Sequence, residues 1–367
     1  MTHSKRILIS GYYGFSNAGD EAVLSAIVRG LKSQANVDIT VLSASPEETA
    51  RVHGVRALPR MSLSQVTRAL KDCDLFISGG GSLIQDATSL RSLTYYLAVI
   101  SLAKRYRRKV MILGQGIGPL RRSISRRLVK KALTGVGLIT VRDAQSAELL
   151  ASMGIGPVKV TADPTFMLEP CADEESDRLL GEVGLRADDN IVAVSLRRLR
   201  FLQRGPDPVE SDITEALRTL AGELPAKLML VGMQSPDDLI MAREIGEKIG
   251  VPFQTSPWTA EEFLGVISRC RLVVGMRLHS LIFGAAVGIP CFGMIYDPKV
   301  ESFLAATGQL GMNLEEVICG YMAEWVRNAW NARDELASNL SELVPPMKKA
   351  ASENMRLAVE LLAGQEG

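Results

Sequence analysis

Residues 272–290, LVVGMRLHSLIFGAAVGIP, join an apolar strand to an apolar helix through a short polar turn. The strand is expected to end at Gly275, and the helix is expected to begin within a few residues of it. Between them lie Arg277 and His279, one of only three histidines in 367 residues. A cation and a proton-transferring group at the carboxyl end of a strand, beside a helix N-terminus, are typical of an anion site. The alternative is a salt bridge at Arg277 and a histidine packed in the core.

Strand-like apolar runs alternate with helical patterns along most of the chain, as in βαβ units that form a parallel sheet. We expect strands at 6–10, 37–43, 75–78, 109–114, 138–141, 158–161, 191–195, 227–231, 251–254, 271–275 and 291–295. Thr259-x-x-Glu262 forms a capping box that predicts a helix over 261–268. The final segment, 321–362, is expected to be helical and broken at Pro345-Pro346.

These patterns predict an α/β protein with two Rossmann-like domains that face each other across a cleft. The first domain is expected to cover residues 1–170 and the second residues 171–320. Helices over 321–367 are expected to pack back toward the N-terminal domain.

The composition indicates a globular protein without a general affinity for nucleic acid. Apolar residues make up 47% of the chain and aromatic residues 5%, which fits an aliphatic globular protein. A net charge of +1 gives no general attraction to nucleic acid. Ile7-Leu8-Ile9 is interpreted as a first strand rather than a signal peptide, and we expect a soluble cytoplasmic protein. The cysteines are scattered without a C-x-x-C pair, which favours neither a disulfide framework nor a zinc site; they are Cys73, Cys171, Cys270, Cys291 and Cys319.

One segment, 121–131, is strongly basic. It contains Arg121, Arg122, Arg126, Arg127, Lys130 and Lys131. Ile124, Leu128 and Ala132 recur within it at helical spacing, so an amphipathic helix with a basic outer face is predicted. That face is either solvated or in contact with anionic lipid headgroups at a membrane surface.

Four loops of the first half follow predicted strands, where open α/β sheets bind ligands. Residues 11–21 lack both a dinucleotide fingerprint and a P-loop. Asn17, Asp20 and Glu21 in this loop either bind sugar hydroxyls or cap the helix that follows. Residues 79–86 carry three glycines and end at Asp86, which is either a carboxylate stabilised by a helix dipole or a catalytic base.

Residues 114–119 and 141–143 complete this set. Arg142 either holds an anion or pairs with a neighbour, and Asp143 is predicted to be an N-cap. In the second half, the run 194–200 places arginines at the end of a strand. Strand alternation directs Arg197 and Arg198 to opposite sides, and we expect Arg197 to face the site.

Taken together, these loops and above all residues 276–280, MRLHS, resemble the polysaccharide pyruvyl transferase family. That family is similar in fold to B-type glycosyltransferases and uses phosphoenolpyruvate to install a pyruvate ketal on a sugar. Its better known bacterial members act on N-acetylmannosamine in a lipid-linked precursor of a secondary cell wall polymer, and the ketal anchors surface-layer proteins. The resemblance implies a donor site at Arg197, Arg277, Leu278, His279 and Ser280. It implies an acceptor site in the first-half loops, at Gly14, Asn17, Asp20, Glu21, Gly80, Gly81, Gln115 and Arg142.

The chemistry of these residue types agrees with the resemblance. Phosphoenolpyruvate carries a phosphate and a carboxylate, which guanidinium groups and helix N-terminal amides bind well. His279 is the expected acid that protonates C3, and Asp86 is the expected base that accepts the proton of the sugar hydroxyl. No metal or cofactor is required.

Two other functions compete with this interpretation. Nucleotide-sugar glycosyltransferases of the same fold resemble one another in a glutamate on the helix after this strand, which binds the ribose diol. Residues 280–290 contain no carboxylate, which favours a donor without ribose. A non-catalytic glycan- or anion-binding module is the third possibility, and it would bind phosphoenolpyruvate or sugar without turnover.

Overall fold

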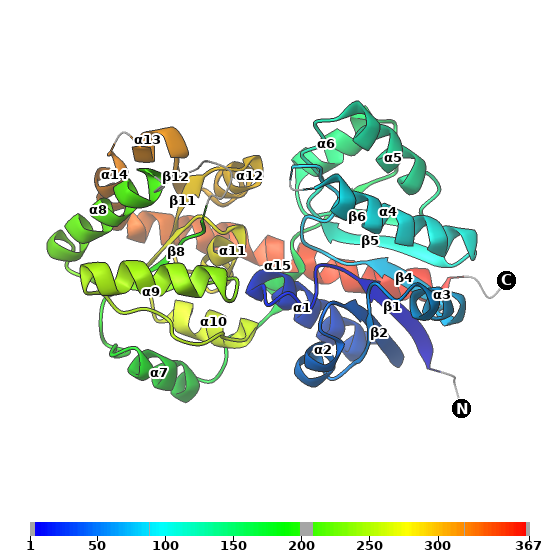
Figure 1. Cartoon of the computed structure of the whole chain (residues 1–367), viewed down its shortest axis with the longest axis horizontal. Coiled ribbons are helices and arrows are strands. Elements are labelled where there is room, and N and C mark those ends of the chain that lie inside the picture. Colours follow the sequence, from blue (N-terminus) through cyan, green and yellow to red (C-terminus); the bar gives the residue numbers. More distant parts are fainter. Residues whose placement is uncertain (1–3, 88, 199–207, 319, 365–367) are drawn as a thin grey trace. The chain divides into compact units, whose positions relative to one another are not determined.

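The computed structural model describes residues 4–87, 89–198, 208–318 and 320–364. They form two compact units, the first made of residues 4–168 with 347–364 and the second of Glu169–Pro346. Each unit contains its own sheet covered by helices (Figure 1). We predicted a separate C-terminal region over 321–367; in the structure, residues 321–346 belong to the second unit and the rest to the first.

The first unit is built on a parallel seven-stranded sheet in the order β3-β2-β1-β4-β5-β6-β7. Its strands are β1 (Lys5–Ser10), β2 (Val37–Ser43), β3 (Arg56–Pro59), β4 (Leu75–Ser78), β5 (Lys109–Gln115), β6 (Leu138–Val141) and β7 (Lys159–Val160). Its helices before residue 168 are α1 (Ala18–Gln34), α2 (Pro46–His53), α3 (Leu63–Asp72), α4 (Leu90–Arg105), α5 (Ser123–Leu133) and α6 (Ala144–Ser152), followed by a 3-10 turn, Pro164–Met167. The strand order reverses between β1 and β4, which is where open sheets of this type bind ligands.

Successive side chains of β1 point to opposite faces of the sheet and pack into two cores, one on each face. Leu8 packs in one core with apolar residues of α3, α4, α5 and α6. Ile7 and Ile9 pack in the other with α1 and with Met355 and Ala358 near the C-terminus. The sheet is therefore buried on both sides, as parallel sheets usually are.

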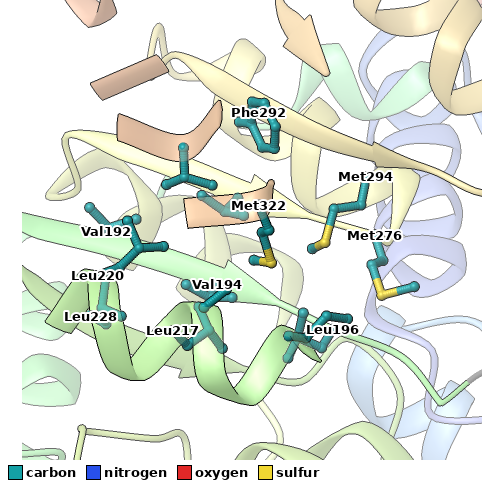
Figure 2. Close-up of a cluster of buried hydrophobic side chains, with 14 of the residues drawn as sticks. Val192, Val194, Leu196, Leu217, Leu220, Leu228, Met276, Phe292, Met294 and Met322 are labelled. Atoms are coloured by element: carbon teal, nitrogen blue, oxygen red, sulfur yellow. The ribbon is translucent and has the colours of Figure 1, made fainter. Parts of the chain in front are cut away.

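The second unit has five parallel strands in the order β12-β11-β10-β8-β9. They are β8 (Ile191–Ser195), β9 (Lys227–Val231), β10 (Leu272–Gly275), β11 (Cys291–Ile295) and β12 (Leu310–Asn313). Its helices before residue 332 are α7 (Asp173–Glu182), α8 (Pro208–Glu223), α9 (Asp237–Ile249), α10 (Ala260–Ser268), α11 (Leu278–Ala286), α12 (Pro298–Thr307), α13 (Leu314–Ile318) and α14 (Met322–Asn331). Figure 2 shows one of its cores, where Val192 and Val194 of β8 lie near Leu217 and Leu220 of α8. Here the order of the strands reverses between β8 and β10.

The predicted α/β class with two Rossmann-like units is confirmed, and the cleft expected between them stays a prediction. Two edge strands, β3 and β12, were not predicted. Residues 251–254, predicted as a strand, form only an isolated bridge between Leu230 and Phe253. Asp143 and Thr259 cap α6 and α10 as predicted.

The predicted break at Pro345-Pro346 is wrong, because α15 runs without interruption from Arg333 to Ala363. The two prolines remove the amide donors for the carbonyl oxygens of Ser341 and Glu342. Both of those residues are exposed, so water can bind the freed oxygens.

Asn354, buried near the end of α15, ties this helix to the first unit. Its Oδ1 accepts hydrogen bonds from the hydroxyls of Thr140, at 2.7 Å, and Thr161, at 2.9 Å. Its Nδ2 donates to the carbonyl oxygen of Ala162 at 3.1 Å. The part of α15 after residue 346 is therefore an integral part of the first unit.

Candidate functional site

The most promising site in the second unit lies where β8 and β10 end. The two strands are neighbours, with Gly275 beside Ser195, and the amide of Met276 donates to the carbonyl oxygen of Ser195 at 2.9 Å. The chain therefore leaves the sheet at the same edge in both places. This brings Arg197 to the same side as the start of α11, at the reversal of strand order.

Arg197 is a half-buried cation that has no carboxylate partner among the described residues. Its Nη1 donates to the Tyr296 hydroxyl at 2.8 Å, and its guanidinium carbon lies 5.0 Å from the centre of that ring. Its Nε is buried and makes no hydrogen bond within the described part of the chain. The next residue, Arg198, turns away to Glu244 of α9, as strand alternation predicts.

The N-terminus of α11 adds polar groups beside this cation. Arg277 occupies the N-cap position without a side-chain cap, and the first amides of a helix have no partner within it. The side chain of Leu278 is buried, so only its backbone N–H can contribute to donor binding. The hydroxyl of Ser280 is committed to the carbonyl oxygen of Arg277 at 2.6 Å. We therefore correct the donor role of Ser280 to that of shaping this turn.

Arg277 forms the salt bridge that was the alternative interpretation. Its Nε and Nη2 donate to the carboxylate of Asp238, at 2.9 and 2.7 Å, and Asp238 is almost completely buried. Asp238 also accepts the amide of Gln234 at 3.0 Å, so its position is fixed. This side-on pair leaves Nη1 of Arg277 on the opposite edge of the guanidinium.

His279 lies in the first turn of α11 and is half-buried. Its ring centre is 6.5 Å from that of Phe283, one helical turn further on. The imidazole is thus supported by packing while part of the residue stays accessible. Such a position suits a group that exchanges a proton with a ligand.

In the first unit, two of the predicted acceptor residues have structural roles. Asn17 caps α1, because its Oδ1 accepts the amides of Gly19 and Asp20 at 3.1 and 3.3 Å. Glu21 accepts the amide of Gly14 at 2.7 Å and pairs with His53 at 2.9 Å. The capping alternative is therefore confirmed for Asn17, whereas Glu21 does not cap the helix and instead holds Gly14 and His53 in place.

Asp20 is better placed to meet a ligand. It lies where the loops after β1 and β4 meet, because a side chain at Gly81 (φ +78°) would come within 2.7 Å of its Oδ1. Gly80 in the same loop lies close to α1, because a side chain at this position would clash with Val23.

Burial, together with the neighbouring charge of Asp20, raises the pKa of Tyr13 well above its ordinary value. Tyr13 was not predicted from the sequence, since a single tyrosine in a glycine-rich loop gives no distinctive signal.

Gln115, at the end of β5, is fully buried against the loop after β4. Its amide nitrogen donates to the carbonyl oxygen of Ser78 at 2.9 Å and to the Ser78 hydroxyl at 2.8 Å. Its Oε1 is buried and has no hydrogen-bond donor among the described residues. Gln115 therefore shapes this loop and keeps one unused acceptor.

Arg142 is committed to neighbours rather than open to an anion. Its Nη1 donates to Asp163 and its Nη2 to the Ser82 hydroxyl, at 2.9 and 3.0 Å. The guanidinium also covers Gly116, where any side chain would clash with it. This pairing corrects its assignment as a ligand-binding residue.

Asp86 is a helix cap, which contradicts its predicted role as the base. It lies in the loop before α4, and its two carboxylate oxygens accept the amides of Arg121 and Arg122 at 2.8 and 2.9 Å. Burial alone would raise the pKa of Asp86, but these hydrogen bonds outweigh it and lower the pKa below its ordinary value. A carboxylate held in this way is a poor proton acceptor.

We predict that Asp86→Asn destabilises the protein by about 1–3 kcal/mol, because the amide cannot accept both hydrogen bonds. The folded-state pKa is depressed, so the carboxylate stabilises the fold at pH values above about 4, and this stabilisation is lost as pH falls through the lower folded value. Urea unfolding of both proteins between neutral and acid pH measures the effect, and the difference should shrink at low pH. The exposed Asp38→Asn is the matched control. A hundredfold fall in kcat for Asp86→Asn would instead restore the role of base.

No group of three or more His, Cys, Asp or Glu side chains in the described part of the chain could hold a metal ion. Burial raises the pKa of the Cys73 thiol to about 11 and that of Cys270 to about 12, so both stay protonated near neutral pH. Cys319 lies outside the described residues. Among the helices described, none is long and apolar enough to cross a membrane.

Comparisons with known proteins identify the family to which this chain belongs. Residues 17–298 match the family described as polysaccharide pyruvyl transferase. The amylovoran biosynthesis protein AmsJ of Erwinia amylovora is 21% identical over 402 aligned residues, covering 92% of this chain and 95% of AmsJ.

Two solved structures share the fold. A glycosyltransferase from Rickettsia africae has a TM-score of 0.64 at 10% identity, covering 99% of this chain and 100% of its own. The UDP-GlcNAc 2-epimerase of Neisseria meningitidis, bound to UDP-GlcNAc, has a TM-score of 0.61 at 13% identity, covering 98% and 100%. These two similarities establish the fold alone. The match over 17–298 is what decides the family: the chain belongs to the polysaccharide pyruvyl transferases and is a transferase.

Proposed function

We propose that the enzyme transfers pyruvate from phosphoenolpyruvate to a sugar of a polysaccharide precursor and releases phosphate. The observation that carries this proposal is the environment of Arg197. This half-buried cation has a buried Nε without a hydrogen bond and no carboxylate partner in the described part of the chain. Burying a charge without a partner is costly, so such a site favours an anionic ligand.

The donor site would combine three kinds of group. Arg197 and the N-terminal amides of α11 would bind the phosphate and the carboxylate of phosphoenolpyruvate. The free edge of Arg277, held in place by Asp238, would supply a second guanidinium contact. His279 would donate a proton to C3 of the donor, which turns the methylene into a methyl group and develops positive charge at C2.

On the acceptor side, Asp20 replaces Asp86 as the carboxylate that we assign to catalysis. One sugar hydroxyl forms a bond to C2 of the donor while its proton passes to Asp20. Phosphate then leaves C2, and a second hydroxyl of the same sugar closes the ketal and releases its own proton. The proposed reaction uses no cofactor besides phosphoenolpyruvate.

We further propose that the acceptor is part of a lipid-linked glycan at the cytoplasmic face of a membrane. The name of AmsJ, an amylovoran biosynthesis protein, supports a polysaccharide rather than a free sugar as the acceptor. The family resemblance makes N-acetylmannosamine in a secondary cell wall polymer precursor the first acceptor to test. A ketal on that sugar would anchor surface-layer proteins.

The direct test incubates the purified protein with phosphoenolpyruvate and candidate glycans. We expect phosphate release that depends on the glycan, and a product whose mass has increased by one pyruvate ketal. A parallel reaction supplies UDP-sugars in place of phosphoenolpyruvate. Transfer of a sugar in that reaction, with none of pyruvate in the first, would establish a glycosyltransferase instead.

A further inference from the structure

Helix α5 (Ser123–Leu133) lies beside α4 in the first unit (Figure 1). Two of its aliphatic side chains are exposed. Ile124 is 50% exposed and Leu128 is 37% exposed. They are four residues apart, so they lie next to each other on one face of the helix. The opposite face buries Val129 and Leu133 in the core. Ile124 and Leu128 therefore present aliphatic surface to solvent.

A cluster of cations lies beside this apolar pair in the segment 121–131. The side chains of Arg121, Arg122, Arg126, Arg127, Lys130 and Lys131 are all exposed. Among the described residues none of them forms an ion pair within 4 Å, although the charge of Arg122 acts on Asp86. Their side chains make one hydrogen bond in the described part of the chain, from Arg126 Nε to the Leu120 carbonyl oxygen at 3.0 Å. Residues 87–142 contain thirteen lysines and arginines and no aspartate or glutamate, although the net charge of the chain is only +1.

Two exposed arginines in other helices are neutralised within their own helix. Arg178 pairs with Glu175 and Glu182, and Arg356 pairs with Glu353 and Glu360. Such pairs are a common feature of a solvated helical face. The described residues of α5 form no such pair, and the helix contains no carboxylate that could form one.

We infer that α5 is a docking surface for an anionic lipid bilayer. The helix lies parallel to the membrane, the cations contact lipid phosphates, and Ile124 and Leu128 enter the boundary between headgroups and acyl chains. Aliphatic side chains beside the basic face favour lipid over nucleic acid, whose unpaired bases are bound by aromatic side chains. No aromatic residue lies in the segment 121–131.

This surface is linked to the loop after β4 through Asp86, which caps the N-terminus of α5. If the acceptor is lipid-linked, as proposed above, docking of α5 would hold the acceptor loops close to the lipid. That consequence rests on the proposed function, whereas the binding of α5 to lipid does not.

The test measures co-sedimentation of the full-length protein with vesicles, without donor or acceptor. Vesicles of phosphatidylcholine with roughly one-third phosphatidylglycerol should bind it at about 0.1 M salt, and vesicles of pure phosphatidylcholine should not. Arg126→Gln, Arg127→Gln, Lys130→Gln and Lys131→Gln combined should lower the partition coefficient by up to roughly a thousandfold, at about 1 kcal/mol for each charge. Ile124→Ser with Leu128→Ser should weaken binding while the charge is unchanged.

The matched control removes four exposed cations of the second unit by Arg218→Gln, Lys227→Gln, Arg243→Gln and Lys248→Gln, and it should bind vesicles as the parent does. Equal binding to neutral and anionic vesicles, or full binding by the α5 variants, would overturn the inference. So would displacement of the protein from vesicles by duplex RNA at equal phosphate concentration. Because all replaced side chains are exposed, unfolding midpoints should stay unchanged.

Discussion

Replacement of His279 by glutamine should lower kcat about a hundredfold or more, while the KM for phosphoenolpyruvate changes much less. Glutamine keeps a polar side chain at the start of α11 but cannot deliver a proton to C3 of the donor. Steady-state kinetics with saturating acceptor measure the two parameters separately. Circular dichroism and the unfolding midpoint should match those of the parent protein, since the residue is only half-buried.

His53→Gln is the control for the loss of a histidine as such. His53 is bonded to Glu21 and belongs to the first unit, so its loss should affect stability more than the chemical step. If His279→Gln turned over at the parental rate, the imidazole would not be the acid and the proposed mechanism would fail.

The second large effect is expected at Arg197. Arg197→Gln removes the charge but keeps a hydrogen-bond donor, and the loss of a charge-assisted contact with the donor should cost about 2–4 kcal/mol. That corresponds to a KM for phosphoenolpyruvate raised roughly thirtyfold to seven hundredfold. Arg198→Gln, at the adjacent position and paired with Glu244, should leave this KM nearly unchanged.

Stability gives an independent test of the same variant. Removal of a structural arginine leaves a charged partner unpaired, whereas the partner of Arg197 among the described residues is the neutral hydroxyl of Tyr296. The Arg197→Gln protein should therefore lose no more than about 1 kcal/mol of stability in the absence of ligand. Clear destabilisation, combined with an unaltered KM, would identify Arg197 as a structural residue and remove the main support for the anion site.

Much of the fold was predictable because most strands are short apolar runs bounded by glycine or polar turns. The two missed strands lack this signal. β3 reads RALP and is half-buried or exposed throughout, and β12 reads LGMN. Each lies at the edge of its sheet, where one neighbour is missing and the requirement for apolar residues is weaker.

The candidate site was predictable in position but not in its pairings. The position of the site at the carboxyl ends of the strands follows from the fold class. Capping by Asp143 was predicted, and capping was one of the two roles predicted for Asn17. The partners of Arg277 and Arg142 are Asp238 and Asp163, which lie 39 and 21 residues away in the sequence. Only the packed chain brings such groups together, so a single sequence left each of these arginines with two possible roles.

The path of α15 has a consequence for how the protein is synthesised. The strands of the first unit are translated before the second unit, but Met355 and Ala358, which complete one of the first unit's cores, are translated after it. The second unit is contiguous in sequence, so all of its residues emerge before the first unit can close. A premature stop after residue 346 would therefore damage the beginning of the chain more than its middle.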